Sequence, residues 1–235
     1  MKKVFIYLLS GIAALSLAGC AAPKKTGIAG IVDDFFESSY EYQKERSVYQ
    51  DGVESEIITE GKYIASPYQE YVRVVEPAES GVWSEMYISG RGRMVNYVMK
   101  TKDGLAKQKA GRSYPYGYGE DLKFTLAREE NVDGVTCEVY QTSYTVEIGG
   151  GLRSRETLTA VISQEYYIDT DKKQVVMVYT DLTEQNRKTN IVNEMMMKDI
   201  SAKEAEKNVE DTEYTAYERV KIYNYNGDIQ IEKLK

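Results

Sequence analysis

The chain has 235 residues, with 30 lysines and arginines against 37 aspartates and glutamates, and it contains no histidine. Its net charge of −7 disfavours nucleic acid and anionic lipid surfaces as partners, because both would repel an acidic protein. Without histidine, the chain lacks His-based acid/base catalysis, Ser-His-Asp and Cys-His nucleophile pairs, and the usual zinc sites.

The first 20 residues have the parts of a leader for export and lipid modification. Two lysines precede an apolar run of 14 residues over 4–17, which is shorter than the stretch of about 20 that a membrane-spanning helix needs. The run ends in Leu17-Ala18-Gly19-Cys20, which resembles the lipobox of bacterial lipoproteins. That resemblance implies cleavage before Cys20 and a diacylglyceryl group on its sulfur, which anchors the protein to the membrane. The alternative is a plain secretory signal in which Cys20 is incidental.

These features divide the chain into three parts. We expect residues 1–19 to be a signal peptide, 20–27 to hold the lipidated cysteine and a linker, and 28–235 to form a single extracytoplasmic domain. Removal of the leader leaves 28 basic against 37 acidic residues, a net charge of −9. Only Cys137 then remains free, so no intrachain disulfide is available. We expect a monomer without a cofactor, anchored to the cell membrane and facing outside the cytoplasm.

The domain begins with an amphipathic pattern. From Ile28 onward the apolar residues follow the i, i+3, i+4, i+7 spacing of a helix, and acidic residues occupy mainly the other face. The pattern predicts a helix over residues 28–45. Insertion into a membrane surface is the alternative, but a membrane-surface helix has a basic polar face rather than an acidic one. We therefore expect this helix to pack on a sheet.

After Asp51-Gly52 the apolar residues alternate with a period of two, which is typical of strands with one dry and one wet face. Turn sequences such as Asp103-Gly104 and Asn226-Gly227 favour an antiparallel meander. The stretch 186–200 fits either a strand or a helix, and a capping box at Ser201 predicts a short helix to about residue 208. The predicted strands cover residues 54–64, 69–76, 83–89, 93–101, 123–129, 135–147, 157–169, 174–182, 213–225 and 228–233.

Some predicted strands, such as 93–101 and 174–182, are apolar on both faces, so a second layer must cover one face. The fold class that follows is mainly β (α+β): a single curved antiparallel sheet meander, half-barrel like, with the N-terminal helix packed on one face. This outline resembles the lipoprotein-carrier and mycobacterial lipoprotein half-barrels. The resemblance implies a role in holding acyl chains or other apolar ligands. It is one of architecture alone, since no residue motif of these families is matched in the sequence.

Three groups of residues are candidates for binding a ligand. An aromatic side chain on the apolar face of the predicted helix points toward the expected cavity. Three tyrosines on a Gly- and Pro-containing loop suit stacking on sugars or closing over an apolar cavity, unless they are an ordinary loop. Two arginines near the single tryptophan offer planar donors to a phosphate or carboxylate, unless they form a solvated turn. The candidates are Phe35, Trp83, Arg91, Arg93, Tyr114, Tyr116 and Tyr118.

The sequence therefore predicts a membrane-anchored, non-catalytic lipoprotein that binds an apolar or lipid-like ligand in a cavity between sheet and helix, near Ile31 and Phe35. The alternative is a cell-surface module that binds cell-wall glycan or a partner protein through the Tyr114–Gly119 loop. An enzyme that uses a carboxylate pair is a third hypothesis, and no activated nucleophile supports it. Asp169 and Asp171 lack the further acidic ligands of a calcium loop, so we expect no metal site.

Overall fold

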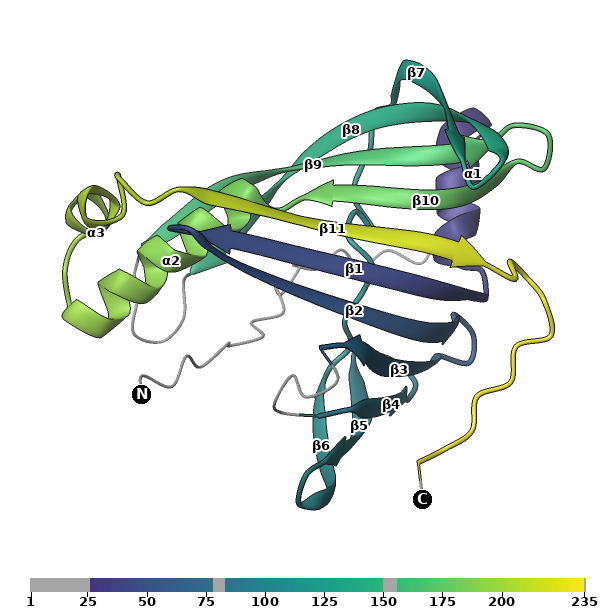
Figure 1. The fold of residues 1–235 in the computed structure, drawn as a ribbon, viewed down its shortest axis with the longest axis horizontal. Helices are drawn as coiled ribbons and strands as arrows, with labels where there is room; N and C mark the ends of the chain where they lie inside the picture. Colours follow the sequence, from purple (N-terminus) through teal and green to yellow (C-terminus); the bar gives the residue numbers. More distant parts are fainter. Residues whose placement is uncertain (1–25, 78–82, 150–155, 235) are drawn as a thin grey trace.

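The computed structural model describes residues 26–77, 83–149 and 156–234. In these residues one antiparallel sheet of 11 strands has the order β6-β5-β4-β3-β2-β1-β11-β10-β9-β8-β7 (Figure 1). The predicted fold, a single curved antiparallel meander with few helices, is confirmed. The strands are β1 (Tyr40–Gln50), β2 (Val53–Ile64), β3 (Gln69–Glu76), β4 (Glu85–Ser89), β5 (Met94–Thr101), β6 (Gly104–Gly111), β7 (Thr125–Val132), β8 (Val135–Gly149), β9 (Thr157–Asp169), β10 (Gln174–Asp181) and β11 (Tyr214–Tyr223), and the helices are α1 (Gly27–Phe36), α2 (Thr183–Lys198) and α3 (Ala202–Asn208).

The strand order consists of two meanders joined by the last strand. Strands β1 to β6 follow one another across one half of the sheet, β7 to β10 follow one another across the other half, and β11 pairs with both β1 and β10. Strands β6 and β7 are therefore neighbours in the sequence but lie at opposite edges of the sheet. Residues 112–124, which join them, must cross from one edge to the other.

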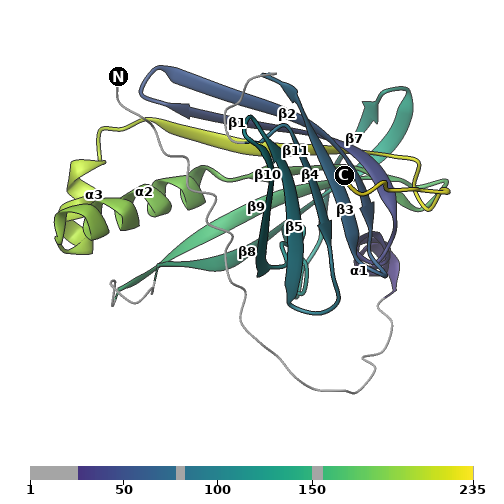
Figure 2. The ribbon, with the colours of Figure 1, turned by 90° about the horizontal axis from the view of Figure 1, so that it is seen from below.

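The β1–β2 hairpin shows how one face of the sheet becomes buried. Strand β1 turns into β2 through Asp51 and Gly52, whose φ angles of 49° and 80° are those of a tight hairpin turn. Alternation then fixes one face of each strand, since Tyr40 pairs with Tyr63 and Tyr42 with Gly61. These rings face the concave side, where α1 and α2 lie at opposite ends of the long strands (Figure 2).

Helix α1 is shorter than predicted. It ends at Phe36, and the hydroxyl of Ser38 donates a hydrogen bond of 2.5 Å to the carbonyl of Asp34. The predicted range of 28–45 was wrong beyond residue 36, because residues 40–50 form strand β1 instead. Tyr40 satisfies the helical spacing and the strand alternation equally well. Pairing with β2 on one side and β11 on the other decides in favour of the strand.

The structure resolves one segment whose secondary structure was ambiguous and corrects the prediction for two others. The ambiguous stretch 186–200 belongs to helix α2, which ends at Lys198 with Asp199 in the left-handed conformation. Strand β6 was not predicted, because its small and charged residues show no apolar alternation. The predicted strand 228–233 is absent from the structure, where the described residues after β11 are irregular.

Helices α2 and α3 form a second apolar cluster. Buried Ile191 and Met195 of α2 pack against Ala205 and Val209. The hydroxyl of Thr183 donates to the carbonyl of Ala216 and accepts from its N–H, which ties the start of α2 to β11. None of the described helices has the length and apolar character that a membrane span needs.

On the convex face, the ion pair of Arg128 and Glu165 makes a contribution to the free energy of unfolding that can be tested. Two guanidinium nitrogens of Arg128 donate to the two carboxylate oxygens of Glu165 at 2.9 and 2.8 Å. Hydrogen bonding by Arg128 lowers the pKa of Glu165 to about 2, and Gln141 and Tyr167 add to this effect. Bidentate geometry makes such a pair stronger than most surface ion pairs.

We expect Glu165→Gln to lower the free energy of unfolding by about 1 kcal/mol at pH 7, and the melting temperature by about 2–4 °C. Because the folded-state pKa of Glu165 lies below its unfolded value, the stabilisation is complete above about pH 4.5 and declines as the pH falls toward 2. Thermal unfolding of both proteins from pH 7 to pH 3 checks this. A difference between them that grows on acidification would contradict the assignment.

Candidate functional site: the covered concave face

The segment of residues 112–124, called here the crossing segment, runs over the concave face from β6 to β7. It has no helix or strand, and two successive turns shape its middle: Tyr118 N–H donates to the Pro115 carbonyl, and Glu120 N–H donates to that of Gly117. Its 13 residues can reach about 45 Å when extended, so a direct path across the face is available. The crossing segment is thus the cover of the concave face between α1 and α2.

At its first residue, Arg112 lies between two aromatic rings. The guanidinium carbon is 3.9 Å from the ring centre of Tyr68 and 4.6 Å from that of Tyr114. One terminal nitrogen donates to the hydroxyl of Tyr63 at 3.0 Å, while the buried Nε has no hydrogen-bond partner among the described residues. Among the described residues, no carboxylate oxygen lies within 4.0 Å of the guanidinium nitrogens of Arg112. Cation–π contacts therefore hold the start of the cover in place.

The middle of the crossing segment is attached by side-chain packing, which includes the buried Leu122, and by two long hydrogen bonds. The carbonyl of Tyr116 accepts from the amide of Gln164 at 3.3 Å and from the hydroxyl of Tyr166 at 3.5 Å, both long for hydrogen bonds of these kinds. Tyr118 contacts Phe36 edge-on, with ring centres 5.6 Å apart. Long hydrogen bonds and ring contacts are easier to separate than a strand ladder, so this cover can be displaced without breaking the sheet.

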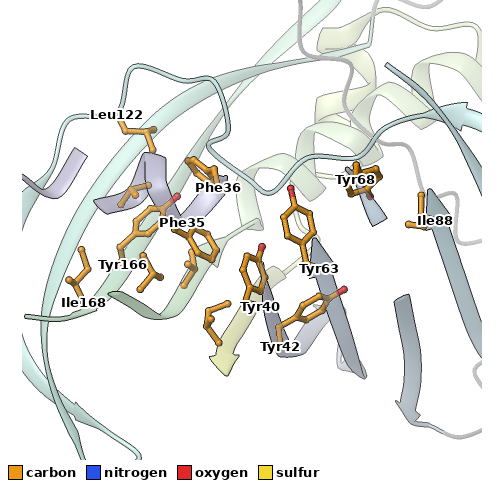
Figure 3. Packing of buried hydrophobic residues seen from close by; sticks show 14 of the residues in the cluster. Phe35, Phe36, Tyr40, Tyr42, Tyr63, Tyr68, Ile88, Leu122, Tyr166 and Ile168 are labelled. Atoms are coloured by element: carbon orange, nitrogen blue, oxygen red, sulfur yellow. The ribbon is translucent and has the colours of Figure 1, made fainter. Parts of the chain in front are cut away.

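Beneath the cover lies the main buried cluster (Figure 3). The rings of Phe35 and Tyr40 stack with centres 5.0 Å apart, as do those of Tyr40 and Tyr63. Tyr166 meets Phe124 of the crossing segment edge-on at 5.6 Å. The cluster joins α1, both meanders and the crossing segment through aromatic surface, which accommodates apolar ligand chains as readily as it accommodates other rings.

Two tyrosine hydroxyls on the concave face share one carboxylate. Both hydroxyls of Tyr42 and Tyr68 donate to Glu70, at 2.7 and 2.8 Å. Burial raises the pKa of Tyr42, and the charge of Glu70 raises it further. These tyrosines therefore stay neutral and act as hydrogen-bond donors, with no nucleophilic phenolate at physiological pH.

Further along the concave face, Lys44 forms an ion pair with the buried Glu218, with 3.6 Å between nitrogen and oxygen. Burial alone would lower the pKa of Lys44, but the carboxylates of Glu218 and Glu70 outweigh it and raise the pKa. Tyr116 lies nearby, and burial together with the charge of Glu218 raises its pKa. The centre of the concave face thus contains the Lys44–Glu218 ion pair, with aromatic side chains around it.

Two hollows on the described residues both lie away from the expected cavity between sheet and helix. One hollow of about 560 Å³ lies between α2 and α3 and is lined by charged residues such as Arg187 and Glu206, and the other lies beside Glu56 and Pro77. Side chains of α1 fill the space against the sheet instead. The space between α1 and the sheet is thus occupied by the buried aromatic cluster.

The seven candidate residues have different positions. Phe35 is buried in the core with only 3% of its surface exposed, whereas Tyr114 and Tyr118 are each 40% exposed and stack with centres 4.5 Å apart. Tyr116 is half-buried over the concave face. The structure therefore brings Tyr114 and Tyr118 together beside α1, where Tyr118 contacts Phe36. Tyr116 packs elsewhere, against the cluster of Ile162 and Leu182.

The remaining candidates lie apart from that cluster. Trp83 is half-buried just before β4, and Arg91 and Arg93 are exposed in the turn before β5. The carbonyl of Arg93 accepts from the N–H of Arg112 at 2.7 Å, so the turn adjoins the start of the crossing segment. Cys20, the predicted lipidation site, lies outside the described residues.

No protein-family model and no curated protein matches the sequence. Similar solved structures include lipoprotein LppX from Mycobacterium tuberculosis, with 12% identity over 87% of this chain and 97% of that one and a TM-score of 0.45. LprF from Mycobacterium bovis has 8% identity over 88% and 94%, with a TM-score of 0.43. A LolA superfamily protein from Nitrosomonas europaea has 12% identity over 65% and 69%, with a TM-score of 0.28. The predicted weak resemblance to these half-barrels is confirmed.

Sequence reasoning missed two parts of the site, Arg112 and Glu70. Each is a single charged residue in a segment with many others, and its role depends on rings that are distant in the sequence. A cation directly before a tyrosine-rich loop was the available signal for Arg112. No local signal marks Glu70, because its partner Tyr42 belongs to a strand predicted as helix. In the described residues no cluster of three or more acidic or cysteine side chains is placed to hold a metal.

Proposed function

We propose that this protein is a membrane-anchored extracytoplasmic lipoprotein, non-catalytic, that binds an apolar or lipid-like ligand on its concave face beneath the crossing segment. The observation that carries the proposal is that a buried aromatic surface is covered by an irregular segment attached through long hydrogen bonds. Anchoring through the diacylglyceryl group of Cys20 would place this face close to a source of such ligands. The outlines of LppX, LprF and the LolA-like structures accord with this role.

Displacement of the crossing segment is the step that admits a ligand. The rings of Phe36, Tyr40 and Tyr166 would then line a surface shared by helix and sheet. A ligand that replaces the contacts of Tyr118 and Phe124 would recover their buried apolar area, at about 25 cal/mol per Å². A polar end of the ligand would lie within reach of Lys44 and Glu218.

The first test is native mass spectrometry of the chain from residue 21 onward, purified from cells, with and without organic extraction. We expect a bound apolar molecule that extraction removes, and uptake of a fluorescent fatty acid by the extracted protein. A clean mass before extraction, together with no uptake, would overturn the proposal.

A pair of glycines tests whether the crossing segment controls entry. A Cβ at Gly117 would lie 2.7 Å from the amide oxygen of Gln164, whereas a Cβ at Gly119 has nothing within 4 Å. Both glycines have positive φ, of 84° and 81°, so backbone strain is matched. We expect Gly117→Ala to speed fatty-acid uptake about fivefold, because about 1 kcal/mol of steric strain is relieved when the segment lifts. Gly119→Ala should change the rate less than twofold, and equal rates in the two variants would exclude gating by this segment.

A second function is favoured by one specific observation. Tyr114 and Tyr118 present a stacked, partly exposed pair of rings backed by Arg112, which suits stacking on the face of a sugar. If the concave face stays closed to ligands, the protein is a surface module for cell-wall glycan or a partner protein. Co-sedimentation with purified cell wall, lost in Tyr114→Ala/Tyr118→Ala, would support this reading.

A further inference from the structure

The hairpin of β5 and β6 has a charge opposite to that of the whole chain. Residues 91–112 contain seven cations and a single anion, Asp103, a net charge of +6 in a protein whose net charge is −7. Clustering of one sign on one element creates a local potential that the net charge conceals. The cations are Arg91, Arg93, Lys100, Lys102, Lys107, Lys109 and Arg112.

The strand register places much of this charge on the convex face. Lys109 pairs with Asn96, Lys107 with Val98, and Leu105 with Lys100, so these side chains point the same way, opposite to buried Val95. Lys100 is in an ion pair with Glu85. Arg112 is held between the rings of Tyr68 and Tyr114. Among the described residues, the other five cations of this segment have no carboxylate within 4.0 Å, so their charge is available to a partner.

Protection of an open sheet edge explains only part of this pattern. Lysines on an edge strand prevent pairing with other strands, and β6 is an edge strand. The opposite edge, β7, is protected differently, because Arg128 is offset by Glu129 and Glu130. Edge protection also does not require Arg91 and Arg93, which precede β5. Edge protection therefore does not account for the whole excess of cations in residues 91–112.

Apolar side chains accompany the cations. Leu105 and Met94 are 42% and 50% exposed on the hairpin. Register places both on the same face as Lys100, Lys107 and Lys109. Unpaired lysines together with exposed apolar side chains are the composition of surfaces that lie in the headgroup region of a bilayer.

We infer that the β5–β6 hairpin docks on the anionic phospholipid surface of the membrane. Anionic headgroups attract Lys and Arg near a bilayer, and the hairpin lies at the edge of the sheet, away from α2 and β7 (Figure 1). The acidic remainder of the chain is screened beyond about 10 Å in 0.1 M salt.

Docking is tested without the anchor, using the chain from residue 21 onward and vesicles of phosphatidylglycerol and phosphatidylcholine in equal parts. We expect co-sedimentation in 50 mM salt that is lost in 500 mM salt and is absent with phosphatidylcholine alone. Because each lysine at such a surface contributes a factor of about five, Lys107→Gln/Lys109→Gln should lower the partition coefficient about thirtyfold.

The matched control is Lys203→Gln/Lys207→Gln on α3, which removes the same net charge from another exposed surface. We expect this control to bind within twofold of the unaltered chain. Equal losses in the two variants, or no binding to anionic vesicles in 50 mM salt, would overturn the inference, as would binding to a soluble polyanion but not to vesicles. Ligand uptake by the concave face is measured without membranes, so failure of docking leaves that proposal standing and separately testable.

Discussion

Phe35→Ala is expected to lower the free energy of unfolding by about 3–5 kcal/mol. Only 3% of the Phe35 surface is exposed, and its ring is 5.0 Å from that of Tyr40 and 5.5 Å from that of Phe36. Removing it leaves a cavity between α1 and the sheet and loses two aromatic contacts. Urea unfolding followed by tyrosine fluorescence measures the loss, which is a large part of the stability of a typical domain.

Tyr118→Ala serves as the comparison, since it removes a ring of similar size that only borders the cluster through Phe36. Because Tyr118 is 40% exposed, we expect its loss to cost about 1 kcal/mol or less. The prediction also separates two roles for Phe35. A variant that keeps its stability but no longer takes up fatty acid would place Phe35 in a ligand cavity rather than in the core.

Much of the fold could be predicted because its signals are local. Alternation of apolar residues located strands such as 135–147 and 157–169, and the need to cover a second apolar face predicted a layered, curved sheet. Strand β1 was missed because residues 40–45 also satisfy a helical spacing, and only pairing with the distant β11 resolves this ambiguity. Strand β6 was missed for the opposite reason, since an edge strand needs no apolar face.

The candidate site was predictable only in part. The loop of Tyr114, Tyr116 and Tyr118 was identified from composition, and the structure places it across the concave face. Its course depends on the order of the strands, which sets β6 and β7 at opposite edges, and no local pattern encodes that order. The net charge, an average over the whole chain, also conceals the basic segment 91–112. A running count of charge along the sequence would have revealed it.

Gly61→Ala is expected to lower the free energy of unfolding by about 3 kcal/mol. Gly61 lies directly across from Tyr42, and a Cβ there would overlap the phenol ring. The ring therefore covers the glycine, an arrangement that stabilises glycine in a sheet. Displacing it costs about 1–3 kcal/mol in steric strain and also breaks the 2.7 Å hydrogen bond from the Tyr42 hydroxyl to Glu70.

Gly111→Ala is the matched control, because that glycine also lies in a strand but has nothing within 4 Å of an added Cβ. We expect it to change stability by less than about 0.5 kcal/mol. A double-mutant cycle isolates the contact: with Tyr42→Ala in the background, the cost of Gly61→Ala should nearly vanish, since no ring remains to be displaced. An equal cost in both backgrounds would show that the methyl group strains the strand itself. The packing of Tyr42 over Gly61 would then not contribute to positioning the hydrogen bond from Tyr42 to Glu70.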